Sequence, residues 1–265
     1  MEREAPEPTG NGLVRNLHRY LRDDRDAEEG LEHKGSNGVE TAVVKGDYDF
    51  YHFGHKLNDM GWGCAYRSFQ TLCSWFVLQR HPNFVTASAS GKEQALVAVP
   101  SHKKVQETLF RIGDKPIHFI GSREWIGSYE LCLCFDAMFN IKCKILYLAS
   151  GKEVAGKYDL FRQHFLTHGC PIMIGGKSGG ALTLLGVRRW NDEDSTNGNT
   201  TDNNNNNNNN KMEMLLLDPH YVGPDKPASI LASSQWCYWR EPEQVFAADS
   251  FYNFLLPQAA TENTQ

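Results

Sequence analysis

The sequence predicts an α+β fold, and three observations support this class. Helical and strand patterns alternate along the chain without forming regular βαβ units, which argues against a doubly wound parallel sheet. Apolar residues make up 40% of the 265 residues and charged residues 22%, which suits one globular domain with its own core. No internal repeat recurs at a period of about 20 to 50 residues, so solenoids and propellers are excluded.

The two ends of the chain are expected to lie outside this domain. Residues 1–42 are rich in charge and poor in aromatic side chains, so we expect a disordered tail there. Leu13, Leu17 and Leu21 recur at helical spacing, and a short docked helix is the alternative for that stretch. The predicted folded domain spans residues 43–257, and residues 258–265 form a second disordered tail.

Within the domain, three helices are predicted. The first begins at Cys64 with Ala65, Phe69, Leu72 and Phe76 on one face, and it ends before Pro82, which cannot continue a helix. Two others are expected at residues 129–139 and 158–168. Short apolar runs bounded by turn residues predict mostly antiparallel strands at 117–120, 143–148, 171–174, 181–187, 212–218 and 251–256.

An asparagine tract interrupts the domain. Eight consecutive asparagines occupy positions 203–210, between the buried strands predicted at 181–187 and 212–218. Polar low-complexity sequence of this kind does not pack into a core. We therefore expect residues 191–211 to form a disordered loop insertion, whose closure costs only about 2 kcal/mol more than that of a short turn.

Composition excludes several classes of function. The formal charge of −5 argues against a nucleic-acid binder. No apolar run approaches the roughly 18 residues of a membrane span, and the first residues lack the apolar stretch of a secretory signal. Seven cysteines without a CxxC pair argue against a disulfide framework or a zinc ribbon. We therefore expect a cytoplasmic protein that binds no nucleic acid and does not insert directly into a membrane.

The strongest local motif is Gly61-Trp62-Gly63-Cys64. The glycines allow a close approach of the backbone, and the cysteine opens the first predicted helix, whose positive dipole end favours a thiolate. Cys64 is therefore a candidate nucleophile, although a free cysteine is as often a small core residue. A zinc site at His52, His55 and Cys64 lacks a fourth ligand, so no metal is expected.

A candidate base lies late in the chain, in Asp218-Pro219-His220. Residues two apart in an extended segment project to the same side, so Asp218 could orient His220 as the carboxylate of a catalytic triad does. A solvated turn at the end of a strand is the alternative, because Asp-Pro is common in turns.

Together the two motifs resemble the cysteine proteases specific for the ubiquitin-fold modifier, the UfSP family. Other stretches that fit this family are 113–116, 121–128, 171–176, 218–223, 236–239 and 250–253. The resemblance runs from about residue 43 to 257 and leaves out the charged tail and the asparagine tract. With no large N-terminal domain before it, the chain looks like the short form of the family.

This resemblance implies a papain-like peptidase domain with the nucleophile at the start of a helix packed on the sheet. It implies a thiol protease, acting as a monomer without cofactor, that exposes the terminal glycine of the modifier precursor and releases the modifier from conjugates. Cys64 would be the nucleophile, His220 the general base and acid, and Asp218 its orienting partner, while Trp62 would line a narrow groove that admits only glycine.

One position departs from the family pattern. The family has Tyr-His-Tyr upstream of the cysteine motif, and the second tyrosine helps to bind the oxyanion. Here the stretch is Tyr51-His52-Phe53, one residue closer to the cysteine than usual. Loss of one oxyanion donor costs about 10²–10³ in turnover. Either Tyr51 substitutes through a shifted register, or the backbone N–H of Cys64 works with less help.

Two other functions remain open at this level. An autophagin-like protease of another ubiquitin-like modifier also combines Gly-Trp-Gly-Cys with Asp-Pro-His. A module that binds the modifier but cleaves it weakly is the second alternative, and Phe53 is the reason for considering it.

Overall fold

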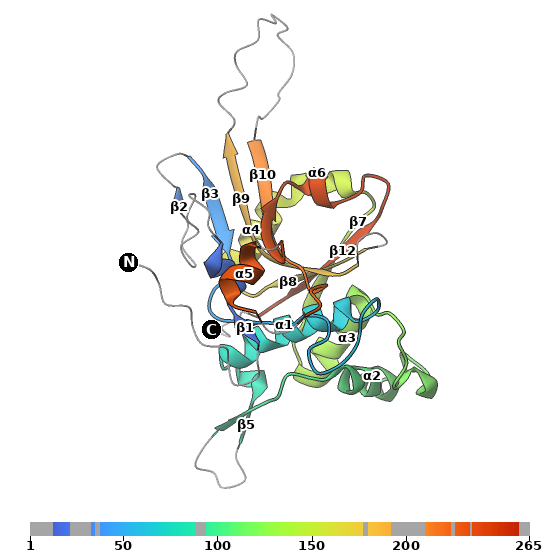
Figure 1. Ribbon diagram of the computed structural model, residues 1–265. Coiled ribbons are helices and arrows are strands. Elements are labelled where there is room, and N and C mark those ends of the chain that lie inside the picture. Colours follow the sequence, from blue (N-terminus) through green and yellow to red (C-terminus); the bar gives the residue numbers. More distant parts are fainter. Residues whose placement is uncertain are drawn as a thin grey trace, which may run out of the picture.

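The computed structural model describes residues 13–21, 33–34, 38–87, 94–176, 180–191, 210–223, 226–233 and 235–259. Figure 1 shows α1, α2 and α3 grouped at one side of a twisted sheet. The helices and 3₁₀ turns are η1 (Leu17–Tyr20), α1 (Cys64–Leu78), η2 (Pro82–Phe84), α2 (His102–Arg111), η3 (Ile117–Phe119), α3 (Ser128–Phe139), η4 (Gly151–Glu153), η5 (Ala155–Lys157), α4 (Tyr158–Thr167), α5 (Ala228–Ser233) and α6 (Pro242–Val245). The strands are β1 (Val14–Arg15), β2 (His33–Lys34), β3 (Glu40–Val43), β4 (Asp49–Phe50), β5 (Val85–Ala87), β6 (Gln94–Leu96), β7 (Cys143–Leu148), β8 (Ile172–Gly176), β9 (Leu182–Asn191), β10 (Asn210–Leu217), β11 (Cys237–Arg240) and β12 (Tyr252–Pro257).

The main sheet contains eight of the described strands, and every pairing in it is antiparallel. Its order is β11-β10-β9-β8-β12-β7, and β3 joins it by pairing with β9. Each face of the sheet has its own core, because successive side chains of a strand point to opposite faces. In β12, Leu255 packs in the core shared with α1 and α3, whereas Phe254 and Leu256 pack on the side of α4. The arrangement confirms the predicted α+β class.

Helix α1 begins at the predicted residue, Cys64, and lies across the sheet on β8 and β9. Its predicted inner face is buried, and the rings of Phe69 and Phe76 lie 4.8 and 5.7 Å from that of Phe135 in α3. Burial of each such ring contributes roughly 2–3 kcal/mol. The first turn of α1 is therefore held in a well-packed core, which fixes the position of Cys64.

The other predicted helices, at 129–139 and 158–168, are confirmed with shifts of one residue, and five of the six strands are confirmed. The strand predicted at residues 117–120 is wrong, because this stretch forms the 3₁₀ turn η3. Pro116 precedes the run and Gly121, with φ of +84°, follows it, so the chain turns at both ends. Only Phe119 is fully buried, whereas Ile117 is 62% exposed. The apolar run thus reflects one anchoring ring and not the face of a strand.

Part of the expected N-terminal tail belongs to the fold. Leu13 and Leu17 are buried, and η1 packs against α5. Strand β3 begins at Glu40 and pairs with β9, so the sheet starts before residue 43. This differs from a disordered tail over residues 1–42. The docked alternative for the leucine stripe holds, although as a single 3₁₀ turn.

The remaining predictions about disorder concern residues 192–209 and 260–265, which lie outside the described residues. Strands β9 and β10 extend to Asn191 and Asn210, the edges of the expected insertion. After β12, Ala259 is buried and the backbone N–H of Gln258 donates to Lys142 O, so the folded chain continues past residue 257. In the part that the structure describes, no helix is long and apolar enough to cross a membrane.

Candidate active site

Cys64 occupies the first position of α1, directly after Gly63 at the N-cap. Its side chain is 7% exposed and lines a cavity of about 180 Å³. The backbone N–H of Ala181, just before β9, donates to Cys64 Sγ over 3.3 Å. The sulfur thus lies at the positive end of a helix and accepts a hydrogen bond from the backbone.

Asp218 and His220 follow the end of β10 and meet as the motif predicts. His220 Nδ1 donates to Asp218 Oδ1 over 2.5 Å, and the same oxygen accepts the backbone N–H of His220 over 2.9 Å. The Asp218 carboxylate thus fixes the orientation of the imidazole and leaves Nε2 as the nitrogen that faces the cysteine.

The imidazole of His220 is brought to Cys64 although 156 positions separate them (220 − 64). A Cβ added at Gly180 would lie 2.7 Å from His220 Nε2 and 3.4 Å from Cys64 Sγ, so both atoms border the same small space. The hydrogen bond that His220 donates to Asp218, followed by the hydrogen bond with Cys64, raises the pKa of His220 to about 10 against the opposing effect of burial. A protonated imidazole beside a sulfur is the arrangement that stabilises a thiolate nucleophile.

The cavity in front of Cys64 forms a groove. Its lining combines bulky aromatic side chains with glycines and alanines from separate segments. It is lined by Trp62, Cys64, Ala65, Trp125, Ile126, Gly127, Ser128, Met173, Gly175, Gly176, Gly180, Ala181, Phe251 and Asn253. Such a groove suits an extended peptide whose residues next to the cleaved bond have no side chains.

The structure places the two candidate oxyanion residues differently. The ring of Phe53 lies edge-on to the ring of His220, with centroids 5.0 Å apart. The ring of Tyr51 instead lies 5.8 Å from that of His55, and Tyr51 does not line the groove. Phe53 therefore holds the position next to the site, and the shifted register that would bring Tyr51 there is not adopted.

The zinc alternative at His52, His55 and Cys64 finds no support in the structure. His52 is buried against the ring of Tyr221, 4.9 Å away, and its Nδ1 bonds to Phe53 O. Among the residues that the structure describes, no three His, Cys, Asp or Glu side chains are grouped so as to hold a metal ion.

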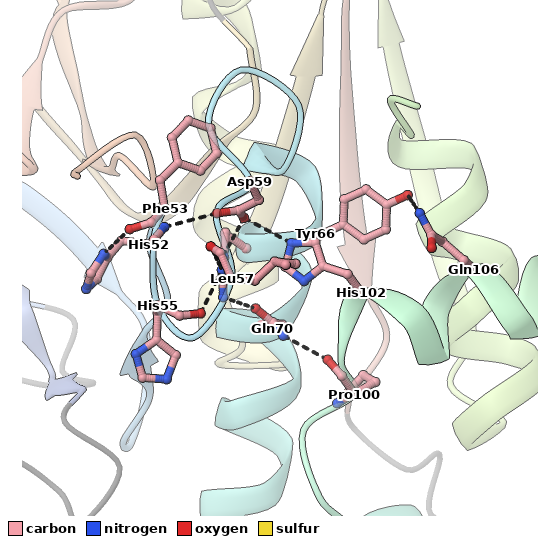
Figure 2. Close-up of polar contacts among 12 residues, drawn as sticks. His52, Phe53, His55, Leu57, Asp59, Tyr66, Gln70, Pro100, His102 and Gln106 are labelled. Atoms are coloured by element: carbon pink, nitrogen blue, oxygen red, sulfur yellow. Dashed lines mark hydrogen bonds and ion pairs between the residues drawn. The ribbon is translucent and has the colours of Figure 1, made fainter. Parts of the chain in front are cut away.

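Sequence reasoning missed a buried charged cluster beside the nucleophile. Figure 2 shows Asp59 facing His102, and Arg67 Nε also donates to the Asp59 carboxylate, over 2.7 Å. One signal was available in the sequence: Arg67 is the single charged residue among the fifteen residues of α1. In the structure its side chain is buried, as are its neighbours in the helix. The cluster could not be read from the sequence, because Asp59 comes from a loop and His102 from another helix.

Comparison with known proteins identifies the family of the chain. The model of peptidase family C78 matches residues 39–255. The chain is 36% identical over 255 residues to human Ufm1-specific protease 2 and 36% identical over 258 residues to a probable Ufm1-specific protease of Oryza sativa. The alignments cover 95% and 94% of this chain but 45% and 34% of those proteins, so the chain spans less than half of their length. The prediction that it is a short family form stays a prediction.

The fold also matches a solved structure, the UfSP of C. elegans, with a TM-score of 0.67 and 30% identity. The match covers 97% of this chain and 40% of the other. It confirms the papain-like α+β fold expected from the motifs, with the nucleophile position at the start of a helix on an antiparallel sheet. The chain belongs to peptidase family C78.

Proposed function

We propose that this chain is a cysteine protease that cleaves after the C-terminal glycine of the ubiquitin-fold modifier. It would trim the modifier precursor and release the modifier from lysines of conjugated proteins. The observation that carries the proposal is the placement of Cys64 Sγ beside His220, whose imidazole is oriented by Asp218. Relatives that are named Ufm1-specific proteases support the choice of substrate.

The proposed reaction uses these three side chains in turn. The Cys64 thiolate attacks the carbonyl carbon of the terminal glycine and forms a tetrahedral oxyanion. His220 gives its proton to the leaving amine as the C–N bond breaks, and a thioester of the modifier remains on Cys64. His220 then takes a proton from water as the water attacks the thioester. The C–S bond breaks, which frees the modifier's carboxyl group and restores the Cys64 thiolate beside a protonated His220. Thiol, imidazole, carboxylate and water suffice, so the chemistry requires no metal or cofactor.

The weakly active binding module is retained as a second candidate because of Phe53. A phenyl ring lies beside His220, at the place where the family has a hydroxyl. If no other donor serves the oxyanion, the protein would bind the modifier and turn it over slowly.

Labelling with a modifier probe that carries an electrophile at its terminal glycine tests the proposal. Wild type should be labelled, Cys64→Ala should not, and Cys73→Ala, which loses a fully buried sulfur on the same helix, should be labelled like wild type. Failure to label wild type, or labelling of Cys64→Ala, would contradict the proposal. A second probe built on an autophagy-type modifier separates the autophagin-like alternative.

The cellular context is part of the same proposal. All seven cysteines are free thiols in the structure, which suits a reducing compartment such as the cytoplasm. We propose a monomer there, with the modifier as its partner and no role for nucleic acid or direct membrane insertion. Sedimentation of the purified chain and microscopy of a tagged one would test these points.

A further inference from the structure

Asp59 is a fully buried carboxylate in the loop that leads from β4 to the nucleophile. It has no exposed surface and does not line the groove. Its Oδ1 accepts the backbone N–H of Gly54 over 3.0 Å, and its Oδ2 accepts Arg67 Nε over 2.7 Å and His102 Nε2 over 3.0 Å (Figure 2). Burial would raise the pKa of Asp59, but the hydrogen bonds from His102 and Arg67 lower it to about 2, so the group stays charged.

The loop closes around this carboxylate and then enters the active site. The backbone carbonyl of Asp59 accepts the N–H groups of Trp62 and Gly63, over 3.2 and 2.9 Å. A Cβ on Gly63 would collide with Asp59 Oδ2, so this position needs glycine for the backbone to approach the carboxylate. Asp59 therefore sets the path of the peptide that immediately precedes Cys64.

Arg67 connects the same loop to the first turn of α1. Besides Asp59, its guanidinium donates to the carbonyl of His55 over 2.9 Å and to Gln70 Oε1 over 3.0 Å. The planar five-donor group can satisfy these acceptors at once, which an ammonium cannot do with the same geometry. The loop and the nucleophile helix thus share one buried ion pair.

His102 connects the loop to α2. Its ring stacks on Tyr66 with centroids 4.6 Å apart, and it meets the ring of Trp62 edge-on at 5.4 Å. Trp62 in turn lines the groove beside Cys64. The carboxylate of Asp59 therefore holds, through one hydrogen bond, the stack that supports a wall of the groove.

We propose that Asp59 is a positioning residue of the active site, whose contacts with Gly54, Arg67 and His102 fix the Trp62–Cys64 segment relative to His220. Asp59 touches neither substrate nor reacting atoms and acts through the backbone it anchors. The proposal rests on the proposed proteolysis at Cys64 and adds to it the group that holds the nucleophile in register.

Asp59→Asn tests this idea, because an amide keeps the volume but cannot accept from all three donors. Displacements near 1 Å cost roughly 10² in rate, so we expect kcat on the modifier precursor to fall by about 30-fold or more. KM should stay within about threefold, since the variant replaces none of the residues that line the groove. Alkylation of Cys64 by iodoacetamide, followed by peptide mass spectrometry, should slow by about fivefold.

Glu213→Gln is the matched control. Glu213 Oε2 lies 2.5 Å from Arg188 Nη2, so this is a second arginine–carboxylate pair with a buried guanidinium, although its carboxylate side chain is 16% exposed. It lies between β9 and β10 and outside the groove. Glu213→Gln should lower the melting temperature without changing kcat or the alkylation rate. Equal losses of kcat in the two variants, or wild-type kcat in Asp59→Asn, would overturn the proposal.

Two further arms keep the test decisive. If Asp59→Asn does not fold, two variants of His102 replace it in the test. His102→Gln, which retains an N–H donor, should keep most of kcat, whereas His102→Leu should lose it. Equal kcat values in these two variants would refute the role of the carboxylate. If wild type does not cleave the precursor, the proposed function fails, but alkylation of Cys64 still compares wild type with Asp59→Asn. An unchanged alkylation rate there would refute the positioning role by itself.

Discussion

Replacing Gly180 with alanine tests the geometry of the active site with a single added carbon atom. Gly180 has φ of +73°, and its Cβ would lie 2.7 Å from His220 Nε2 and 3.0 Å from Cε1. Ordinary contact of a Cβ begins at about 3.4 Å, so the imidazole must retreat by about 0.7 Å (3.4 − 2.7). Because displacements near 1 Å cost roughly 10² in rate, we expect kcat to fall about 30- to 100-fold.

The same change should affect folding much less. Alanine in the left-handed region costs roughly 1–2 kcal/mol of unfolding free energy. Gly113→Ala is the matched control, because Gly113 has φ of +80° and no heavy atom within 4 Å of an added Cβ. Both variants should lose similar stability in urea, but only Gly180→Ala should lose activity.

The assay measures initial rates on the modifier precursor at a temperature at which both variants are folded. Electrophilic-probe labelling counts the active molecules, so that kcat refers to folded enzyme. Wild-type kcat in Gly180→Ala would refute the close approach of the Gly180 backbone to His220 and Cys64. Equal loss in Gly113→Ala would show that strain, and not the displaced imidazole, causes the effect.

Three other changes follow from the site and the core. Asp218→Asn should lower kcat by roughly 10³-fold or more and lower the pKa of His220 from about 10, which a pH–rate profile would show; an unshifted profile would contradict it. Phe53→Tyr should raise kcat by about 10-fold or more, because the added hydroxyl can donate to the oxyanion. Steady-state rates measure this, and an unchanged kcat would contradict it. Burial lowers the pKa of His18 and His164 to about 3 in the folded protein. In the unfolded chain both histidines bind protons below about pH 6.5, so acid favours unfolding. The unfolding free energy should therefore fall by about 1.4 kcal/mol per pH unit for each histidine between pH 6 and 4, and urea titrations with a flat pH dependence would refute this.

The two catalytic motifs could be predicted because each is local. Cys64 begins a helix whose apolar spacing is visible in the sequence, and Asp218 lies two residues before His220, so one extended turn is enough to join them. Several strands of the main sheet were also predictable, because runs such as 143–148 and 212–218 are mostly apolar. The run 117–120 misled because three apolar residues among the four between Pro116 and Gly121 do not distinguish a strand from a turn.

The supporting parts of the site could not be predicted, because they depend on contacts between distant segments. Asp59 and His102 meet only when α2 packs beside α1, and nothing in the sequence pairs them. Gly180 matters because of what a side chain would strike, which requires the positions of His220 and Cys64. Leu17 belongs to η1, which packs against α5 more than 200 positions away, so a charged neighbourhood concealed its burial.

The β9–β10 hairpin explains how residues far apart in sequence form one site while the fold carries a long asparagine tract. Ala181, which contacts Cys64, precedes β9, and Asp218 follows β10. Because Thr183 pairs with Leu217, Ala181 and Asp218 lie at the same end of the hairpin. The tract connects Asn191 with Asn210 at the other end. Eight residues of β10 at about 3.4 Å each separate the two ends by roughly 25 Å. Insertions at that end therefore leave the relative position of Cys64 and His220 unchanged. That position is set by the strand pairs near Thr183 and Leu217 and by the packing of α1 on β8 and β9.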